Sequence, residues 1–159
     1  MKHSSKATDF DFLMGRWEVR DLRLTGWLAG ADEWIELAAT LDVRPLLGGL
    51  ANVDQFRSTV RGEPFEGVSL RLFNPEDETW TIYWMDTNGP RLIEQVTGSF
   101  KNGIGEFHGE EIFRGEPVPM RFLWSEITKI SARWEQAYYD EANDAWETNW
   151  IMEFTRVKD

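Results

Sequence analysis

Residues 91–127, RLIEQVTGSFKNGIGEFHGEEIFRGEPVPMRFLWSEI, contain three stretches of alternating apolar and polar side chains separated by two turns. The pair Asn102-Gly103 is typical of a two-residue hairpin turn, because such turns need positive φ angles. The second turn is Arg114-Gly115-Glu116-Pro117. Alternation with a period of two residues indicates strands with one buried face. This stretch therefore predicts three consecutive strands joined by hairpins.

The same pattern extends in both directions, with further turns at residues 74–78, 87–90 and 141–144. The predicted strands cover residues 16–24, 34–44, 50–58, 64–74, 79–86, 91–100, 104–114, 118–127, 131–140 and 146–156. So many long strands usually close on themselves, because closure removes exposed edges. We therefore expect an all-β protein, a closed antiparallel up-and-down barrel of about ten strands.

The chain has 159 residues, which is the size of one domain. Residues 1–14 are predicted to form a polar tail and a short helix or turn, in which Phe10, Phe12 and Leu13 plug one end of the barrel. Residues 15–159 are predicted to form the barrel as a single domain. Residues 32–41 fit either a helix or a strand, and the longer period-two pattern favours the strand.

Charge and composition exclude several classes of partner and chemistry. The 17 basic and 28 acidic residues give a net charge of −11, which disfavours nucleic acid and anionic membranes as partners. The sequence contains no cysteine, so disulfides, thiolate metal sites and cysteine nucleophiles are excluded. Met1–Phe12 lacks the apolar segment of a secretory signal, and no apolar run is long enough to span a membrane. We expect a cytoplasmic protein.

Aromatic residues make up 14% of the chain, which suits strands and apolar pockets. Alternation assigns the inward-facing residues of five strands. They are Val68, Leu70 and Leu72; Leu92, Glu94, Val96 and Phe100; Met120, Phe122, Trp124 and Glu126; Trp134, Gln136 and Tyr138; and Trp146, Trp150, Met152, Phe154 and Arg156. Because a buried carboxylate is costly unless it is paired or hydrated, inward Glu94 and Glu126 favour a hydrated interior over a filled core.

The predicted ligand-binding residues combine these aromatic groups with a few polar ones. They are Trp84, Glu94, Phe107, Phe122, Trp124, Glu126, Trp134, Gln136, Tyr138 and Trp150. Glu126, Gln136 and Tyr138 are the expected polar anchors. Glu106, His108 and Glu110 share one strand face, but alternate residues lie roughly 6.6–6.8 Å apart, so at most two could share a metal ion. We expect a solvated polar face there, with no metal and no cofactor.

Gly15-Arg16-Trp17 opens the first strand, and Arg156 closes the last. These residues resemble the signature of the calycin superfamily, the lipocalins and fatty-acid-binding proteins. The resemblance implies that Gly15, Trp17 and Arg156 are structural, with the guanidinium packed over the indole.

A further resemblance covers nearly the whole chain. It lies in residues 9–17, DFDFLMGRW, residues 45–49, PLLGG, residues 64–67, PFEG, and residues 84–89, WMDTNG. Together they look like a family of uncharacterised bacterial lipocalin-like domains. This resemblance implies a fold and no particular ligand.

The leading functional hypothesis is a carrier or sensor that binds a small apolar or amphiphilic molecule inside the barrel. One alternative is an isomerase or lyase that uses an inward carboxylate such as Glu94 or Glu126, with Asp86 and Tyr83 as further candidates. The other is an interaction module with a filled barrel, in which outward Trp27 or Trp34 anchors a homodimer.

Overall fold

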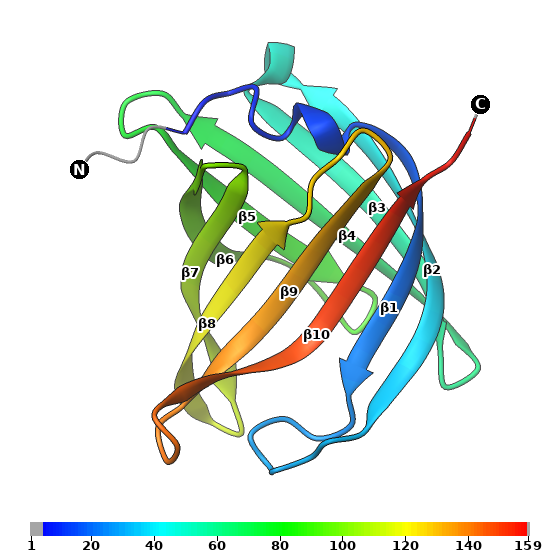
Figure 1. Ribbon diagram of the computed structural model, residues 1–159, viewed down its shortest axis with the longest axis vertical. Coiled ribbons are helices and arrows are strands. Elements are labelled where there is room, and N and C mark those ends of the chain that lie inside the picture. The colour runs from blue at the N-terminus through cyan, green and yellow to red at the C-terminus, as the bar shows by residue number, and fades with distance from the viewer. Residues whose placement is uncertain (1–4, 159) are drawn as a thin grey trace.

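Ten antiparallel strands form one closed barrel in the computed structural model, which describes residues 5–158 (Figure 1). The strands are β1 (Gly15–Leu24), β2 (Trp34–Leu46), β3 (Ala51–Val60), β4 (Glu63–Asn74), β5 (Thr79–Asp86), β6 (Gly89–Lys101), β7 (Ile104–Phe113), β8 (Glu116–Ser125), β9 (Ser131–Asp140) and β10 (Ala145–Arg156). Each strand pairs with its neighbours in sequence, and β1 also pairs with β10. The predicted up-and-down barrel is confirmed.

Helical structure in the described residues is limited to two short 3-10 turns, η1 (Asp11–Leu13) and η2 (Leu47–Gly49). Residues 34–41 of the ambiguous segment 32–41 belong to β2. In this strand Ala39, Leu41 and Val43 are buried, and Leu41 pairs with Trp17 of β1. Because alternate residues of this segment are buried in the core, it forms a strand and not a helix. No helix among residues 5–158 has the length and apolarity needed to cross a membrane.

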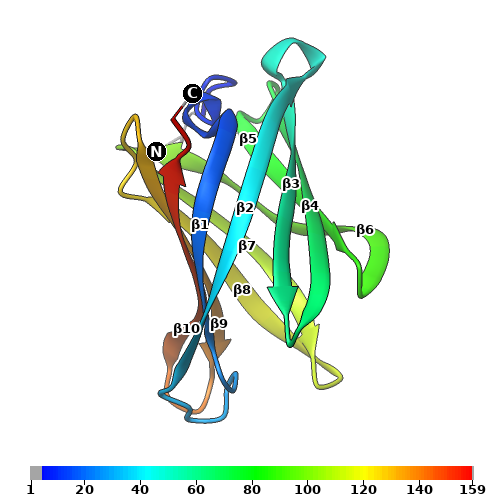
Figure 2. The same ribbon diagram turned by 90° about the vertical axis from the view of Figure 1, so that its right-hand side faces the viewer.

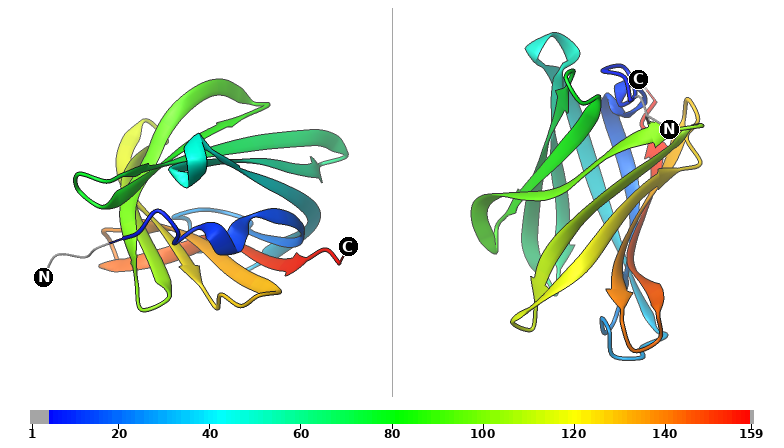
Figure 3. Two further views of the ribbon diagram at one scale, coloured as in Figure 1. Left: turned by 90° about the horizontal axis from the view of Figure 1, so that it is seen from above. Right: turned by 90° about the vertical axis from the view of Figure 1, so that its left-hand side faces the viewer.

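The two ends of the barrel differ. The segment that leads into η1 crosses one end, as the view from above shows (Figure 3). Phe10 and Leu13 are fully buried there, and the Phe10 ring lies 4.9 Å from the rings of Trp80 and Phe100. This end is the floor of the barrel. The loops after β1, β3, β5, β7 and β9 surround the opposite end, which we call the mouth (Figures 1 and 2).

Arg156 joins the first strand, the last strand and the plug at the floor. Its guanidinium lies 4.1 Å from the Trp17 ring centre, so the expected stacking is present. Its two Nη atoms donate to the carbonyl oxygens of Met14 and Phe12, at 2.6 and 2.5 Å. Gly15 leaves room for this contact, since a Cβ at that position would lie 2.8 Å from Arg156 Nη1.

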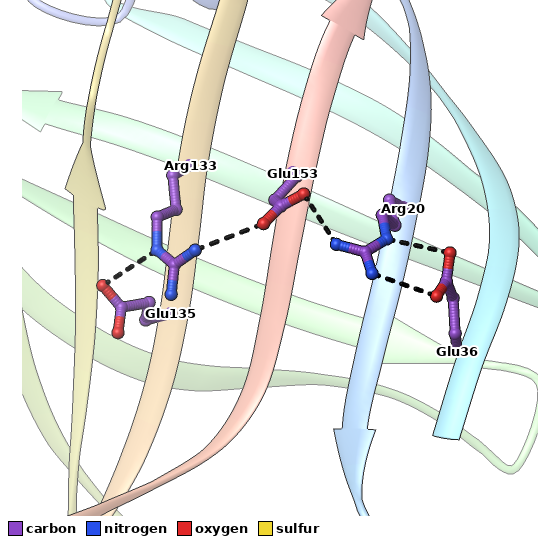
Figure 4. A network of polar contacts seen from close by, with 5 residues as sticks. All are labelled: Arg20, Glu36, Arg133, Glu135 and Glu153. Carbon is purple, nitrogen blue, oxygen red and sulfur yellow. Dashed lines mark hydrogen bonds and ion pairs between the residues drawn. The ribbon is translucent and has the colours of Figure 1, made fainter. Parts of the chain in front are cut away.

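On the outer face, ion pairs link four adjacent strands (Figure 4). Arg20 of β1 bridges Glu36 of β2 and Glu153 of β10, at 2.8 and 3.2 Å. Arg133 of β9 contacts Glu153 and its neighbour Glu135, both at 3.4 Å. These five side chains form the outer ladder, which spans the seam where β1 meets β10.

Four of the five predicted inward faces need correction. In β4 the inner face carries Phe65, Ser69 and Arg71, all of which are buried. The half-exposed outer residues of β4 are Val68, Leu70 and Leu72, which were predicted to face inward. Leu70 lies between Val53 of β3 and Tyr83 of β5, so the outer surface of this strand is apolar. The prediction failed because the more apolar face was assumed to be the inner one.

Extra residues in β6 and β10 reverse the alternation. A register shift against β5 leaves Gln95 unpaired, so Val96 and Phe100 are buried as predicted while Leu92 and Glu94 are exposed. The shift at Asn149 in β10 has the same effect.

In β10, Trp150, Met152 and Phe154 face the interior as predicted. Trp146 instead packs outside against His108 and Tyr139. Glu126 also fails to point inward. It lies beyond the end of β8, is exposed, and has a positive φ of 51°.

An aromatic cavity inside the barrel

A cavity of about 390 Å³ lies inside the barrel. Apolar side chains form most of its wall, namely Leu41, Phe56, Ile82, Trp84, Phe122, Trp124, Trp134, Trp150, Met152 and Phe154. This volume falls within the range of roughly 300–1,000 Å³ that is typical of small-molecule sites. The cavity extends from the floor, near Arg71 and Trp124, to Asn88 and Gly89 at the mouth.

The structure places most of the predicted ligand-binding residues on this wall. They are Trp84, Phe122, Trp124, Trp134, Gln136, Tyr138 and Trp150. Phe107 is fully buried in the floor instead, with its ring 5.7 Å from that of Phe100 and 5.9 Å from that of Phe10. Glu94 and Glu126 are exposed and take no part in the wall. The two carboxylates that were predicted to lie in a hydrated interior are therefore absent from the cavity wall.

Edge-to-face contacts fix the indole rings of the wall. Trp134 packs at 4.9 Å against Phe122 and at 5.2 Å against Trp150, with interplanar angles of 69° and 89°. Trp84 donates its Nε1–H to Asp86 at 2.8 Å. Its ring covers Gly67 of β4, where an added Cβ would lie 2.1 Å from the ring. The wall is thus preorganised before any molecule enters.

A buried ion pair lies in the floor half of the cavity. Arg71 donates from Nη2 to Asp54 at 2.5 Å and from Nη1 to the amide oxygen of Asn52 at 2.8 Å. Asp54 also accepts from the backbone N–H of Ser69 at 2.9 Å. The guanidinium lies 5.4 Å from the centre of the Phe10 ring and 5.9 Å from that of Trp124. Both charges are almost fully buried, and each is compensated by the other.

Two donors on the cavity wall have no hydrogen-bond partner among residues 5–158. They are Nε of Arg71 and Nε1 of Trp124. Both side chains are buried and both line the cavity. Both donor atoms are enclosed by neighbouring side chains, so a molecule held in the cavity does not reach them in this arrangement.

The mouth carries acidic and aromatic groups. Asp86 accepts from the backbone N–H groups of Asn88 and Gly89, at 2.8 and 3.0 Å, and so fixes the β5–β6 turn. Burial and the nearby Glu111 carboxylate raise the pKa of Tyr138, so its phenol keeps its proton at neutral pH. Trp27 packs against Tyr138 at 5.3 Å and lines the cavity. The expectation that Trp27 points outward was wrong.

A second ion pair, between partly exposed Arg23 and buried Asp21, lies beside the cavity. Asp21 is fully buried and accepts from Arg23 Nη2 at 3.1 Å and from Trp150 Nε1 at 2.6 Å. The Arg23 guanidinium stacks 4.2 Å from the centre of the Trp150 ring. Asp21 and Arg23 therefore hold one wall residue in place.

Sequence reasoning missed Asn52, Asp54 and Arg71, although a signal was present. Arg61 and Gly62 both have positive φ and form a two-residue turn between β3 and β4. That turn fixes the register in which Asn52 lies opposite Arg71. Counting outward from it would have paired the polar groups of the two strands.

No group of three or more His, Asp or Glu side chains able to hold a metal ion occurs in the part of the chain that the structure describes. His108 contacts Glu106 at 3.5 Å on the outer face, where both are exposed.

Neither a protein-family model nor a curated protein sequence matches the chain. Solved structures do. An S-type phycobiliprotein lyase from Guillardia theta aligns with a TM-score of 0.62 over 94% of this chain and 91% of the lyase, at 10% identity. A redesigned β-barrel aligns with a TM-score of 0.52 over 98% and 100%, also at 10% identity.

A second redesigned barrel, mFAP0 bound to DFHBI, gives a TM-score of 0.49 over 91% of this chain and 99% of its own, again at 10% identity. Identities this low show the fold alone. The match to the lyase shows that the two proteins share a barrel fold. The resemblances to the calycin superfamily and to the bacterial family stay predictions.

Proposed function

We propose that this protein binds a small, largely apolar molecule inside its barrel, as a carrier or a sensor. The single observation that carries the proposal is the cavity of about 390 Å³ walled by aromatic side chains. Side chains in protein interiors normally pack without voids much larger than a water molecule. An apolar molecule that enters this cavity removes its own surface and that of the wall from water, which is the main source of affinity in such sites.

Tryptophan fluorescence gives a direct test, since Trp84, Trp134 and Trp150 line the cavity. Titration with retinol and with an environment-sensitive dye should quench or shift the emission at micromolar concentration. Native mass spectrometry of the purified protein should also detect a co-purifying molecule. Absence of both effects would contradict the proposal.

A matched pair of variants separates cavity binding from surface binding. Alternate residues of β9 line the cavity, namely Trp134, Gln136 and Tyr138. Ala137, which is next to Gln136, does not line it. Trp134→Ala enlarges and reshapes the wall, so it should weaken dye binding. Trp146→Ala removes an indole from the outer face and should leave dye binding unchanged, which makes it the control.

The enzyme alternative needs an inward carboxylate. Glu94 and Glu126 are exposed and do not provide one, whereas Asp86, a further candidate, lines the cavity. Asp86 already accepts hydrogen bonds from Trp84, Asn88 and Gly89, and we assign no catalytic residue. The interaction alternative required a filled barrel, which the cavity argues against. A homodimer would need another anchor than Trp27, and Trp34, at 40% exposure, is the remaining candidate.

A further inference from the structure

Solvent reaches the cavity at one place. Among the described residues that line it, only Asn88, Gly89 and Ile93 are exposed, and the others are buried or half-buried. All three belong to the β5–β6 hairpin, which projects from the side of the barrel (Figure 2). The opening of the cavity therefore lies beside this hairpin.

Other segments cover the two ends of the barrel. The plug around η1 closes the floor, where Phe10 is fully buried. At the mouth, Trp27 of the β1–β2 loop turns inward, lines the cavity and packs against Tyr138 at 5.3 Å. The N–H of Leu28 donates to the Glu147 carboxylate of β10 at 2.6 Å, which fixes this loop. A molecule that approaches along the barrel axis therefore meets fixed side chains at both ends.

The opening coincides with a gap in the sheet. The ladder between β6 and β7 does not reach residues 89–95 or residues 110–113, so the two hairpins diverge there (Figures 2 and 3). Gln95 on β6 and Glu111 on β7 line the cavity on the two sides of this gap. We call the gap between these two segments the slot. It is a lateral entrance to the cavity.

Polar groups are distributed unevenly along the cavity. In its floor half, Arg71 and Asp54 lie 2.5 Å apart and compensate each other. A charged group brought there from water would find no partner, which is costly. At the slot, Asn88, Gln95 and Glu111 line the cavity beside the solvent. A charged or strongly polar group therefore keeps part of its hydration at the slot and loses it in the floor half.

We propose that ligands enter the cavity sideways through the slot, and that they are amphiphiles with a single polar end, which stays in the slot while the apolar part lies against the aromatic wall. This proposal rests on the binding function proposed above. It adds an entry route and a chemical class of ligand. A molecule with charged groups at both ends is disfavoured, because one of them loses its water in the floor half of the cavity.

Closing the slot tests the entry route. The chain has no cysteine, so Ile93→Cys and Ile112→Cys provide the only two thiols, at exposed positions on the two sides of the slot. A short bis-maleimide that links them should slow association and dissociation of Nile red at least about tenfold in stopped-flow fluorescence, because entry then needs a rearrangement. The dissociation constant should change little. The same protein with both thiols blocked by N-ethylmaleimide should keep the fast rates.

Matched variants give independent checks of the route. The same linker between Lys101→Cys and Ile104→Cys joins two exposed residues that already pair, so it should leave the rates unchanged. Glu111→Trp places a large side chain in the slot and should slow association, whereas Glu110→Trp at an exposed neighbouring position should not. Glu147→Ala removes the acceptor that fixes the loop at the mouth, and it should not speed association.

Two naphthalene probes test the ligand class by calorimetry at neutral pH. They are 2-naphthylmethylammonium and 2,6-bis(ammoniomethyl)naphthalene, which carry one and two charged ends on the same ring system. The dication should bind at least about tenfold more weakly, because its second ammonium group is desolvated in the floor half. The net charge of −11 attracts the dication more strongly at long range, so weaker binding of the dication does not come from that field.

The outcomes distinguish the two proposals. If the slot linker and Glu111→Trp leave the association rate of Nile red unchanged, or if Glu147→Ala raises it, the entry route is wrong and the binding function stands. A dication that binds as tightly as the monocation would overturn the single polar end. If neither Nile red nor the naphthalene probes bind, the proposed function itself fails.

Discussion

At the scale of single residues, the Asp54–Arg71 pair is the least expected feature of the interior. Both side chains are at most 5% exposed, yet they lie among aromatic rings at the floor. Burying charges is unfavourable unless partners compensate them. Asn52, Ser69 and the two charges themselves provide that compensation.

Removing one member should therefore cost more than removing both. We expect Arg71→Met to lower the free energy of unfolding by about 3–5 kcal/mol, because Asp54 is left buried and unpaired. The double variant with Asp54→Leu should lose clearly less. Urea unfolding of the single and double variants measures the difference. A double variant that is less stable than either single variant would show that the pair is a net stabiliser of the fold.

At the scale of elements, the outer ladder of Arg20, Glu36, Arg133, Glu135 and Glu153 reinforces the seam of the barrel (Figure 4). The hydrogen bond from Arg20 lowers the pKa of Glu36, and the partners Glu36 and Glu153 raise the pKa of Arg20. The side chains of Arg20 and Glu36 are about half exposed, at 51% and 56%, so water and salt screen their contribution.

This arrangement predicts a small pH dependence of stability. Because the folded-state pKa of Glu36 is depressed, its contribution is complete above the unfolded value near 4.5 and is lost as the pH falls through the folded value. Glu36→Gln should therefore destabilise the protein slightly at pH 7 and not at all at strongly acidic pH. Urea midpoints at the two pH values, with and without 1 M salt, measure this. An effect that persists in acid would contradict the assignment.

At the scale of the whole molecule, the barrel is closed but unevenly paired. The β6–β7 ladder runs only from Val96–Gly109 to Lys101–Ile104. Gly98 and Gly109 allow this close crossing, since a Cβ on Gly109 would lie 1.8 Å from the Gln95 carbonyl oxygen. Beyond it the β5–β6 and β7–β8 hairpins diverge (Figures 2 and 3). Gln95 and Glu111, one on each side of the divergence, line the cavity.

Hydrogen exchange should reveal this divergence. Residues 89–95 and 110–113 pair with a neighbouring strand on at most one side, because the β6–β7 ladder does not reach them. Their backbone amides should therefore exchange faster than those of residues 96–101 and 104–109. Strand β9 pairs with both β8 and β10 and serves as the protected reference. Mass spectrometry of peptides from these segments gives the rates. Uniform protection across β6 and β7 would contradict the prediction.

The sequence determined the fold because alternation and turn chemistry are local. The hairpin turns at Asn102-Gly103 and Arg114-Gly115 both have positive φ angles, and the ten predicted strands correspond to β1–β10. The aromatic wall around Trp134 also followed from local alternation, whereas the stacking of Arg156 on Trp17 was expected only from the resemblance to the calycin superfamily.

Only the tertiary structure decided which face of certain strands points inward. The extra residues Gln95 and Asn149 turned Glu94 and Trp146 outward, and no local pattern marks a bulge. Arg71 can face inward because Asp54 on the neighbouring strand β3 neutralises its charge. This contact depends on the register of β3 against β4. Orientation is a property of paired strands, since each side chain is placed by its neighbours in space as well as by its own sequence.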